Sequence, residues 1–179
     1  DTTLDNRSES DHTAAMGDAA MQHNVADDLR DCLVRRDITA GLRILATSRD
    51  LLSAIGPNVP GSAELLGYLV QWVELGFSCP AQIASILDRF PAESRVQLPV
   101  LDYVHVRFAE ASLAMWREEY ECALRHFGFI ASVQDDVRNP ELIAICDFWS
   151  GRCLRKLGRY EDALVHTTRG CERAIHLGN

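Results

Sequence analysis

The sequence contains no apolar stretch that approaches the roughly 18 to 20 residues needed to span a bilayer. Its N-terminus also lacks the basic-then-apolar pattern of a secretory signal. A surplus of positive charge is absent as well: the formal net charge is −8, whereas contact with nucleic-acid backbones needs concentrated positive charge. We therefore expect a cytoplasmic protein with no membrane contact and no direct contact with nucleic acid.

Signatures of common enzyme classes are equally lacking. The patterns GxSxG, HExxH, GxGxxG and the phosphate loop do not occur. The adjacent acids Glu118-Glu119 and Glu161-Asp162 point apart on a helix, so neither pair can share a proton. Cys79 stands before an expected helix, a place that favours a reactive thiolate, but no partner base is evident. We expect no catalytic residue and no cofactor.

Six cysteines are present, and none belongs to a paired CxxC motif. Because most fall within helical patterns, we expect reduced, buried thiols that act as small apolar residues. The alternative is a metal site that combines Cys122 and His126, one helical turn apart, with Cys146 or Cys153. Such a site needs at least three close ligands with supporting contacts, and we expect no metal ion.

What the sequence does contain is helical periodicity almost throughout, so we predict an all-α fold. Residues 1–18 are polar and aperiodic and are predicted to be a flexible lead-in to a helical domain of residues 19–179. Ser62 is a candidate N-cap, Ser94 with Gln97 resembles a capping box, and Asn139-Pro140 is a strong helix start. The predicted helices are residues 20–36, 38–54, 62–75, 80–90, 94–116, 118–133, 140–157 and 160–177. They pair into four hairpins, at about residues 20–56, 61–91, 95–135 and 139–178.

One phrase occurs twice at an offset of 40 residues. Tyr120, Glu121, Ala123, Leu124 and His126 are repeated by the residues Tyr160, Glu161, Ala163, Leu164 and His166. Small residues in the first turn of each second helix extend this register, with spacings of 41, 42 and 40 residues: Ala40, Ala81, Ala123 and Ala163. Small side chains suit the place where two helices of a hairpin approach most closely. Stacked helical hairpins are the favoured arrangement, and a non-repetitive helical bundle is the alternative.

This pattern resembles the tetratricopeptide repeat family. Gly158-x-Tyr160-x-x-Ala163-Leu164 matches the family's turn and second helix, and Gly151 falls on the small position of the first helix. Tyr120-x-x-Ala123-x-x-x-Phe127 repeats the phrase. The period of about 40 exceeds the usual 34 and is similar to the repeats of bacterial signal-responsive regulators. Ser78 and Thr167 stand where the family has aromatic residues.

The resemblance implies a right-handed α-solenoid of about eight helices, whose concave groove is lined by the first helix of each hairpin. The groove residues it implies here are Leu66, Val70, Val73, His105, Phe108, Ser112, Met115, Phe148, Arg152, Arg155 and Lys156.

Among these, Arg152 and Arg155 share one helix face with Arg159. They either anchor an acidic partner or pair with nearby acids such as Glu161 and Asp162, and the second reading is favoured.

The resulting functional prediction is a non-catalytic module that binds a protein or peptide as an adaptor or scaffold. The alternative is the sensory N-terminal domain of a bacterial signalling or transcription regulator, with an output domain outside this chain. Homodimerisation through the terminal hairpin is a further prediction.

Overall fold

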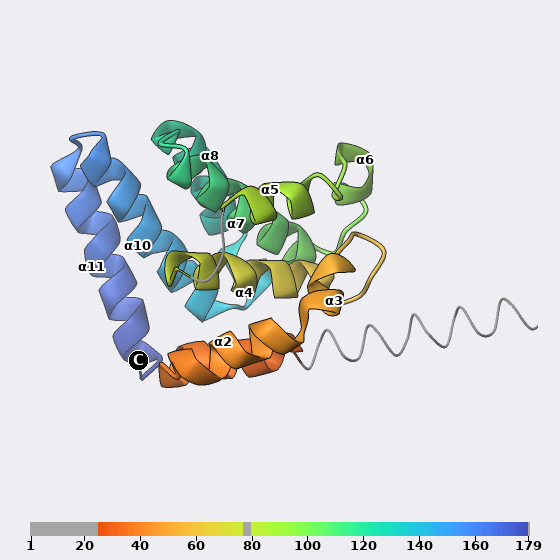
Figure 1. Ribbon diagram of the computed structural model, residues 1–179. Helices are drawn as coiled ribbons and strands as arrows, with labels where there is room; N and C mark the ends of the chain where they lie inside the picture. The colour runs from red at the N-terminus through yellow and green to blue at the C-terminus, as the bar shows by residue number, and fades with distance from the viewer. Residues whose placement is uncertain (1–24, 77–79, 179) are drawn as a thin grey trace, which may run out of the picture.

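A computed structural model describes residues 25–76 and 80–178, and every regular element within these ranges is a helix (Figure 1). The predicted all-α class is thereby confirmed for the described chain, whereas the predicted lead-in 1–18 lies outside the described residues. Residues 25–35 form the first described helical segment. The elements that follow are α2 (Ile38–Thr47), α3 (Arg49–Ser53), α4 (Ser62–Glu74), α5 (Pro80–Leu87), α6 (Ala92–Arg95), α7 (Val100–Trp116), α8 (Tyr120–Ser132), α9 (Gln134–Val137), α10 (Pro140–Lys156) and α11 (Tyr160–His176).

The two long C-terminal helices begin and end where local chemistry places their limits. The side chain of Asn139 caps α10 by accepting a hydrogen bond from the Leu142 backbone N–H at 3.0 Å, and Pro140 occupies the first turn. Gly158 ends the turn between α10 and α11 with φ 76°, a backbone conformation that glycine adopts at little cost. Here the predicted boundaries agree with the structure to within one residue.

Two predicted helices are broken in the structure, and those predictions were wrong. The helix expected at 38–54 stops after Thr47, whose hydroxyl bonds back to the carbonyls of Arg43 and Ile44, and Ser48 is non-helical. The helix expected at 94–116 is interrupted at Pro99, which lacks an N–H and disfavours a helical residue before it.

Smaller corrections concern helix ends. Ser94 lies within the short helix α6 and forms no capping box with Gln97. Gly61, with φ 79°, is the cap residue of α4, and Ser62 is the first helical residue rather than the cap. The turn expected after residue 133 contains the single-turn helix α9.

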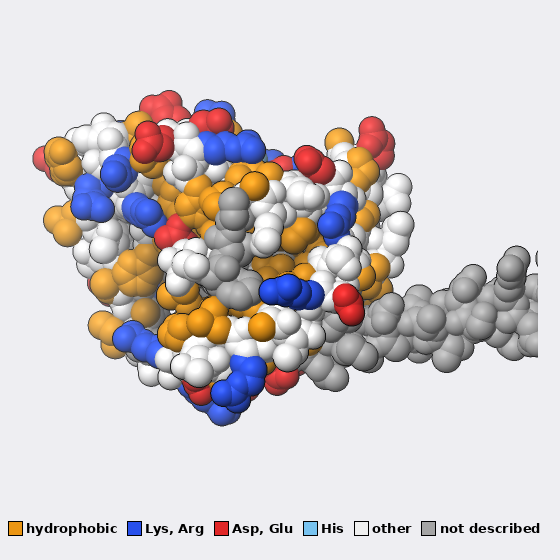
Figure 2. Space-filling model, in the orientation of Figure 1, with side chains coloured by type: hydrophobic (Ala, Val, Ile, Leu, Met, Phe, Trp, Pro, Cys, Tyr) orange, Lys and Arg blue, Asp and Glu red, His pale blue; other side chains and the backbone are white. Residues whose placement is uncertain are grey.

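Consecutive long helices pack on one another: α4 on α5 and α7, α7 on α8, α8 on α10, and α10 on α11 (Figure 1). Aromatic rings join α7, α8 and α10 in the core, where Phe108 stacks on Trp149 at 5.0 Å between ring centroids and Phe127 meets the same indole edge-on. Such pairs add to the stabilisation that their burial supplies. Hydrophobic side chains also reach the surface over α11 (Figure 2).

The small residues of the predicted register are more deeply buried in the C-terminal half of the chain than in the N-terminal half. Ala123 and Ala163 are buried, and a Cβ added at Gly151 would overlap the Thr167 hydroxyl on α11. Close approach of α10 and α11 therefore depends on the small residues Gly151 and Ala163. Ala81 is exposed and Ala40 is only half-buried, so the same register does not mark a close approach in the N-terminal half.

Candidate functional site

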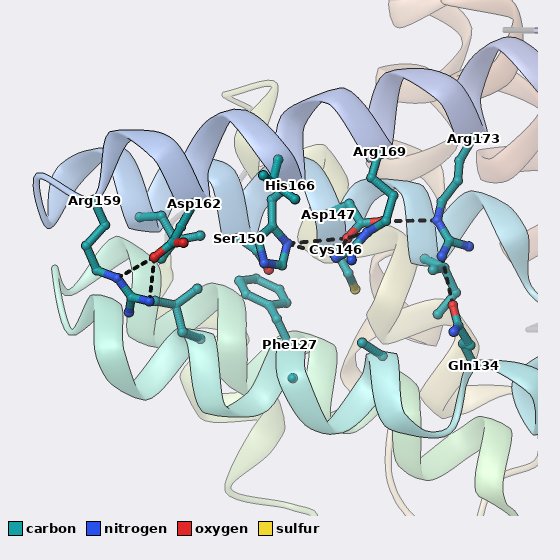
Figure 3. Close-up of a pocket in the computed structure, with 16 residues that line it drawn as sticks. Phe127, Gln134, Cys146, Asp147, Ser150, Arg159, Asp162, His166, Arg169 and Arg173 are labelled. Atoms are coloured by element: carbon teal, nitrogen blue, oxygen red, sulfur yellow. Dashed lines mark hydrogen bonds and ion pairs between the residues drawn. The ribbon is translucent and has the colours of Figure 1, made fainter.

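A groove of about 400 Å³ runs between α8 and α11, with α10 as its floor (Figure 3). We call this feature the outer groove. Its apolar lining comes from Leu124, Phe127, Ala131, Ile143, Leu154 and Val165.

Helical spacing explains how the sequence builds the groove. The face of α8 that carries Leu124, Phe127, Gly128 and Ala131 follows an i, i+3, i+4, i+7 pattern and lies against α10. Gly128 and Ala131 are too small to fill the space toward α11, so a trough remains open. Polar and charged residues of α11 form the opposite edge: Asp162, His166, Arg169 and Arg173.

A buried carboxylate is the centre of the groove. Asp147, on α10, is only 5% exposed, yet it lies among three basic side chains of α11. Arg169 donates to its Oδ1 from Nε at 2.8 Å and also from Nη2. Arg173 Nε lies 3.0 Å from Oδ2, although its N–H is not aligned with that oxygen, and His166 Nδ1 lies 3.4 Å from Oδ1.

The hydrogen bond to Asp147 raises the pKa of the Arg169 guanidinium, against the lowering effect of burial. Arg169 Nη2 also lies 2.9 Å from His166 Nδ1, and because a guanidinium only donates, Nδ1 is the acceptor. Arg173 Nη2 donates to the Gln134 side-chain oxygen at 2.9 Å, which ties α11 to α9.

The charges in this cluster do not cancel. Two guanidinium groups share one carboxylate, so one positive charge is in excess. Each guanidinium carries five N–H donors, more than these contacts use, and both arginine side chains are partly exposed. The centre of the groove can therefore donate hydrogen bonds to an anionic group that enters from solvent.

The predicted basic run does not form a single anchor. Arg152 pairs with Glu74 of α4 at 2.7 Å, and Arg159 donates twice to Asp162, at 2.7 and 3.0 Å. Arg155 and Lys156 are exposed. The favoured pairing with Asp162 is present, and only Arg159 of this run lines the outer groove.

Most residues predicted to line a concave groove belong to the core instead. Seven of the eleven positions are buried in the structure, which corrects the expectation that they present an open surface: Leu66, Val70, Val73, His105, Phe108, Ser112 and Met115. Phe148 is half-buried and, together with His105, lines a separate pocket described below.

The cysteines show no metal-binding arrangement in the part of the chain that the structure describes. Cys122 Sγ lies 3.7 Å from His126 Nε2, but no group of three His, Cys, Asp or Glu side chains converges there or elsewhere in residues 25–76 and 80–178. Burial raises the pKa of the Cys146 thiol, and that of Cys153 to about 11, so both are protonated. Cys79 lies outside the described residues.

Sequence reasoning missed the Asp147 cluster. One available signal was an acid within the otherwise apolar face of α10, since such a residue is rarely buried without partners. A second was the basic triplet His166, Arg169 and Arg173, which has the i, i+3, i+7 spacing of one helix face. What the sequence did not indicate was that these two faces meet.

Within the described ranges, no helix is long and apolar enough to cross a membrane. Comparisons of the chain with protein-family models, with curated proteins and with solved structures yield no match.

Proposed function

We propose that this chain is a non-catalytic helical-repeat module that binds a segment of a partner protein in the outer groove. The observation that carries the proposal is the Asp147 cluster, in which two arginines of an apolar groove share a single buried carboxylate. An apolar trough with one excess positive charge suits a segment that combines apolar and acidic side chains.

The dimensions of the groove support a peptide as its occupant. Arg159 and Arg173, both on its lining, are separated by 14 residues of α11. At about 1.5 Å per helical residue this separation is about 21 Å. An extended strand rises about 3.3 Å per residue, so about six residues fit between the two arginines.

Asp147 supports binding by holding the arginines in place before a partner arrives. A guanidinium that is already oriented by a buried carboxylate loses little side-chain entropy when it binds a second acid. The incoming acid forms charge-assisted hydrogen bonds, which are stronger than neutral ones. A partner glutamate, aspartate or terminal carboxylate is the expected group.

The arrangement of hairpins fits the same proposal. The packed pairs α7–α8 and α10–α11 carry the 40-residue phrase, and α8 packs against α10 to join them. We interpret these pairs as successive repeats of a right-handed stack that resembles the tetratricopeptide family. Repeat stacks of this kind present extended surfaces suited to an adaptor or scaffold.

The test is a selection from random peptides of about 12 residues, displayed on phage, which are long enough to cross the groove at about 3.3 Å per residue. Selected peptides are then measured against Arg169→Gln and Arg173→Gln, and against the matched control Arg155→Gln outside the groove. The proposal expects acidic, apolar peptides whose affinity falls about tenfold or more in the groove variants and changes little in the control. Recovery of no binding peptide, or equal loss in all three variants, would contradict it.

Self-association is a second candidate, favoured by one observation on α11. Tyr160, Leu164 and Ile175 are 69%, 68% and 71% exposed and lie on one stripe of the helix. Their repeat counterparts on α8 include Tyr120 and Leu124, both half-buried against the core. The stripe is therefore the α11 equivalent of a packed helix face.

A second copy of the chain is the occupant proposed for this stripe. Sedimentation equilibrium of the native chain and of Leu164→Glu measures self-association. Val165→Glu is the control at the neighbouring exposed position. A dimer that dissociates in Leu164→Glu alone supports self-association. A native monomer at all concentrations refutes it.

A further inference from the structure

A second cavity, of about 270 Å³, lies on the other side of α10 from the outer groove. We call it the inner pocket. Residues 141, 144, 145 and 148 of α10 line it, whereas residues 143, 147, 150 and 154 face the outer groove. At about 100° per residue these two sets occupy nearly opposite faces of the helix. The remaining walls come from the segment 25–36, from α4 and α7, and from the C-terminal end of α11.

The walls of the inner pocket are mainly apolar. Leu33, Ile145, Phe148 and Leu177 approach it from three segments that are distant in sequence. A pocket of this size, with apolar walls and a few polar groups, is the usual form of a site for a small molecule. The volume lies just below the usual range of about 300 to 1,000 Å³ for such sites, so a small ligand is indicated.

His105 is the unusual polar group in this wall. Its side chain is 2% exposed, and neither ring nitrogen has a hydrogen-bond partner among the described residues. Burial lowers the pKa of His105 to about 4, so the ring is neutral near pH 7. A neutral imidazole offers one donor and one acceptor, and leaving both unpaired in an apolar wall costs stability.

The surrounding sequence makes room for this histidine. A Cβ added at Gly67 of α4 would overlap His105 Nδ1, so glycine is required for the ring to occupy this place. The Tyr68 ring lies beside it, with 6.4 Å between the ring centroids. Two aromatic side chains with polar atoms thus meet at one wall of the inner pocket.

Two arginines lie at the rim of the inner pocket. Arg30 and Arg36 line it together with one acid, Glu141. Arg30 forms ion pairs with Asp27 and Asp31, at 3.4 and 3.5 Å. Exposed pairs at such distances hold a guanidinium weakly, so Arg30 can turn to a new partner.

From these features we infer that the inner pocket binds a small amphipathic acid. Its apolar ring or chain lies against Phe148 and Ile145, and its anionic end meets Arg30 and Arg36 at the rim. The two His105 nitrogens are buried in this structure, and a small shift of the ring lets one of them bond to a polar group of the ligand. The inference does not rest on peptide binding, because the inner pocket and the outer groove lie on opposite faces of α10.

The probe for this site is 1-anilinonaphthalene-8-sulfonate, which joins apolar rings to an anion and fluoresces when it leaves water. Its titration is compared for the native chain, for Val34→Trp, which obstructs the inner pocket from an exposed position, and for Val96→Trp, the matched exposed change outside both cavities. Arg36→Glu and its control Arg155→Glu test the anionic end. Near-ultraviolet circular dichroism of every variant verifies native packing.

Saturable binding is the expected result, with affinity reduced about tenfold or more by Val34→Trp and Arg36→Glu and unchanged by the two controls. The ¹⁵N chemical shifts of the His105 ring should also change when the probe binds. Absence of saturable fluorescence with the natively packed chain overturns the inference. Equal binding by the native chain and Val34→Trp overturns it as well, because the probe would then lie elsewhere.

Discussion

The contact between Gly41 of α2 and Trp72 of α4 allows a quantitative test of how the N-terminal helices pack. Both residues are buried, and Trp72 is among the largest side chains of the core. A Cβ added at Gly41 would overlap two carbons of the six-membered indole ring and would lie 2.9 Å from a third, Cζ3. The ring must move by about 1.5 Å to restore ordinary van der Waals contact, and its surroundings are filled.

Opposing effects set the size of the change for Gly41→Ala. Replacing glycine inside a helix stabilises by about 1 kcal/mol, whereas overpacking a core costs about 1 to 3 kcal/mol or more. Because the overlap involves a rigid, fully buried ring, the upper part of that cost applies. We expect a net loss of about 2 kcal/mol in the free energy of unfolding.

Trp72→Phe removes the outer ring atoms and so relieves the overlap. Alone it loses apolar contact worth about 2 kcal/mol, partly offset because Trp72 Nε1 has no hydrogen-bond partner among the described residues. In the double variant the added methyl group occupies space that the indole has left. The total loss should therefore stay near 2 kcal/mol rather than about 4, a coupling of about 2 kcal/mol.

Urea unfolding followed by far-ultraviolet circular dichroism measures all four chains of this cycle. Equal m values would show that the variants unfold from comparable native states. If the two losses add within about 0.5 kcal/mol, Gly41 does not face Trp72, and the packing of α2 on α4 described above is wrong.

Three further predictions concern single side chains. Asp147→Asn should lower the free energy of unfolding by about 1 to 3 kcal/mol, because Arg169 and Arg173 lose their shared counter-charge. An unchanged midpoint of urea unfolding would contradict a stabilising role for the Asp147 cluster. The free energy of unfolding should fall by up to about 3 kcal/mol as the pH drops from about 6.5 toward 4, because His105 is protonated in the unfolded state but stays neutral when buried in the folded state. His105→Gln should flatten this part of the pH profile. Iodoacetamide should alkylate exposed Cys171 rapidly and spare Cys146, whose burial raises its pKa, and peptide mass mapping that finds equal rates would contradict the core packing.

Strong local signals made the C-terminal half of the fold predictable. Asn139-Pro140 and Gly158 fix the limits of α10 and α11 through a side-chain cap, a proline in the first turn and a positive φ. Such signals act within a few residues and need no tertiary contact. The breaks at Ser48 and Pro99 were missed because apolar spacing continues across them, although Pro99 is itself a local signal against a continuous helix.

The candidate site was less accessible to sequence reasoning, since it depends on which helix faces meet. The spacing of Arg152, Arg155 and Arg159 indicated one basic face. In the structure, however, Arg152 pairs with Glu74 and Arg159 pairs with Asp162. Conversely, the partners of Asp147 are Arg169 and Arg173, which are 22 and 26 residues further along the chain. Periodicity identifies a face but does not identify its partner.

The proposed function is tested most directly by a cycle between Arg169 and the acid of a selected peptide. The affinities of the native chain and of Arg169→Gln are measured by calorimetry for the peptide and for a version in which that acid is replaced by its amide. The account predicts that the amide version binds the native chain about tenfold more weakly but binds Arg169→Gln with little further loss. If the two changes weaken binding independently, the acid does not meet Arg169, and the outer groove is not the site that recognises it.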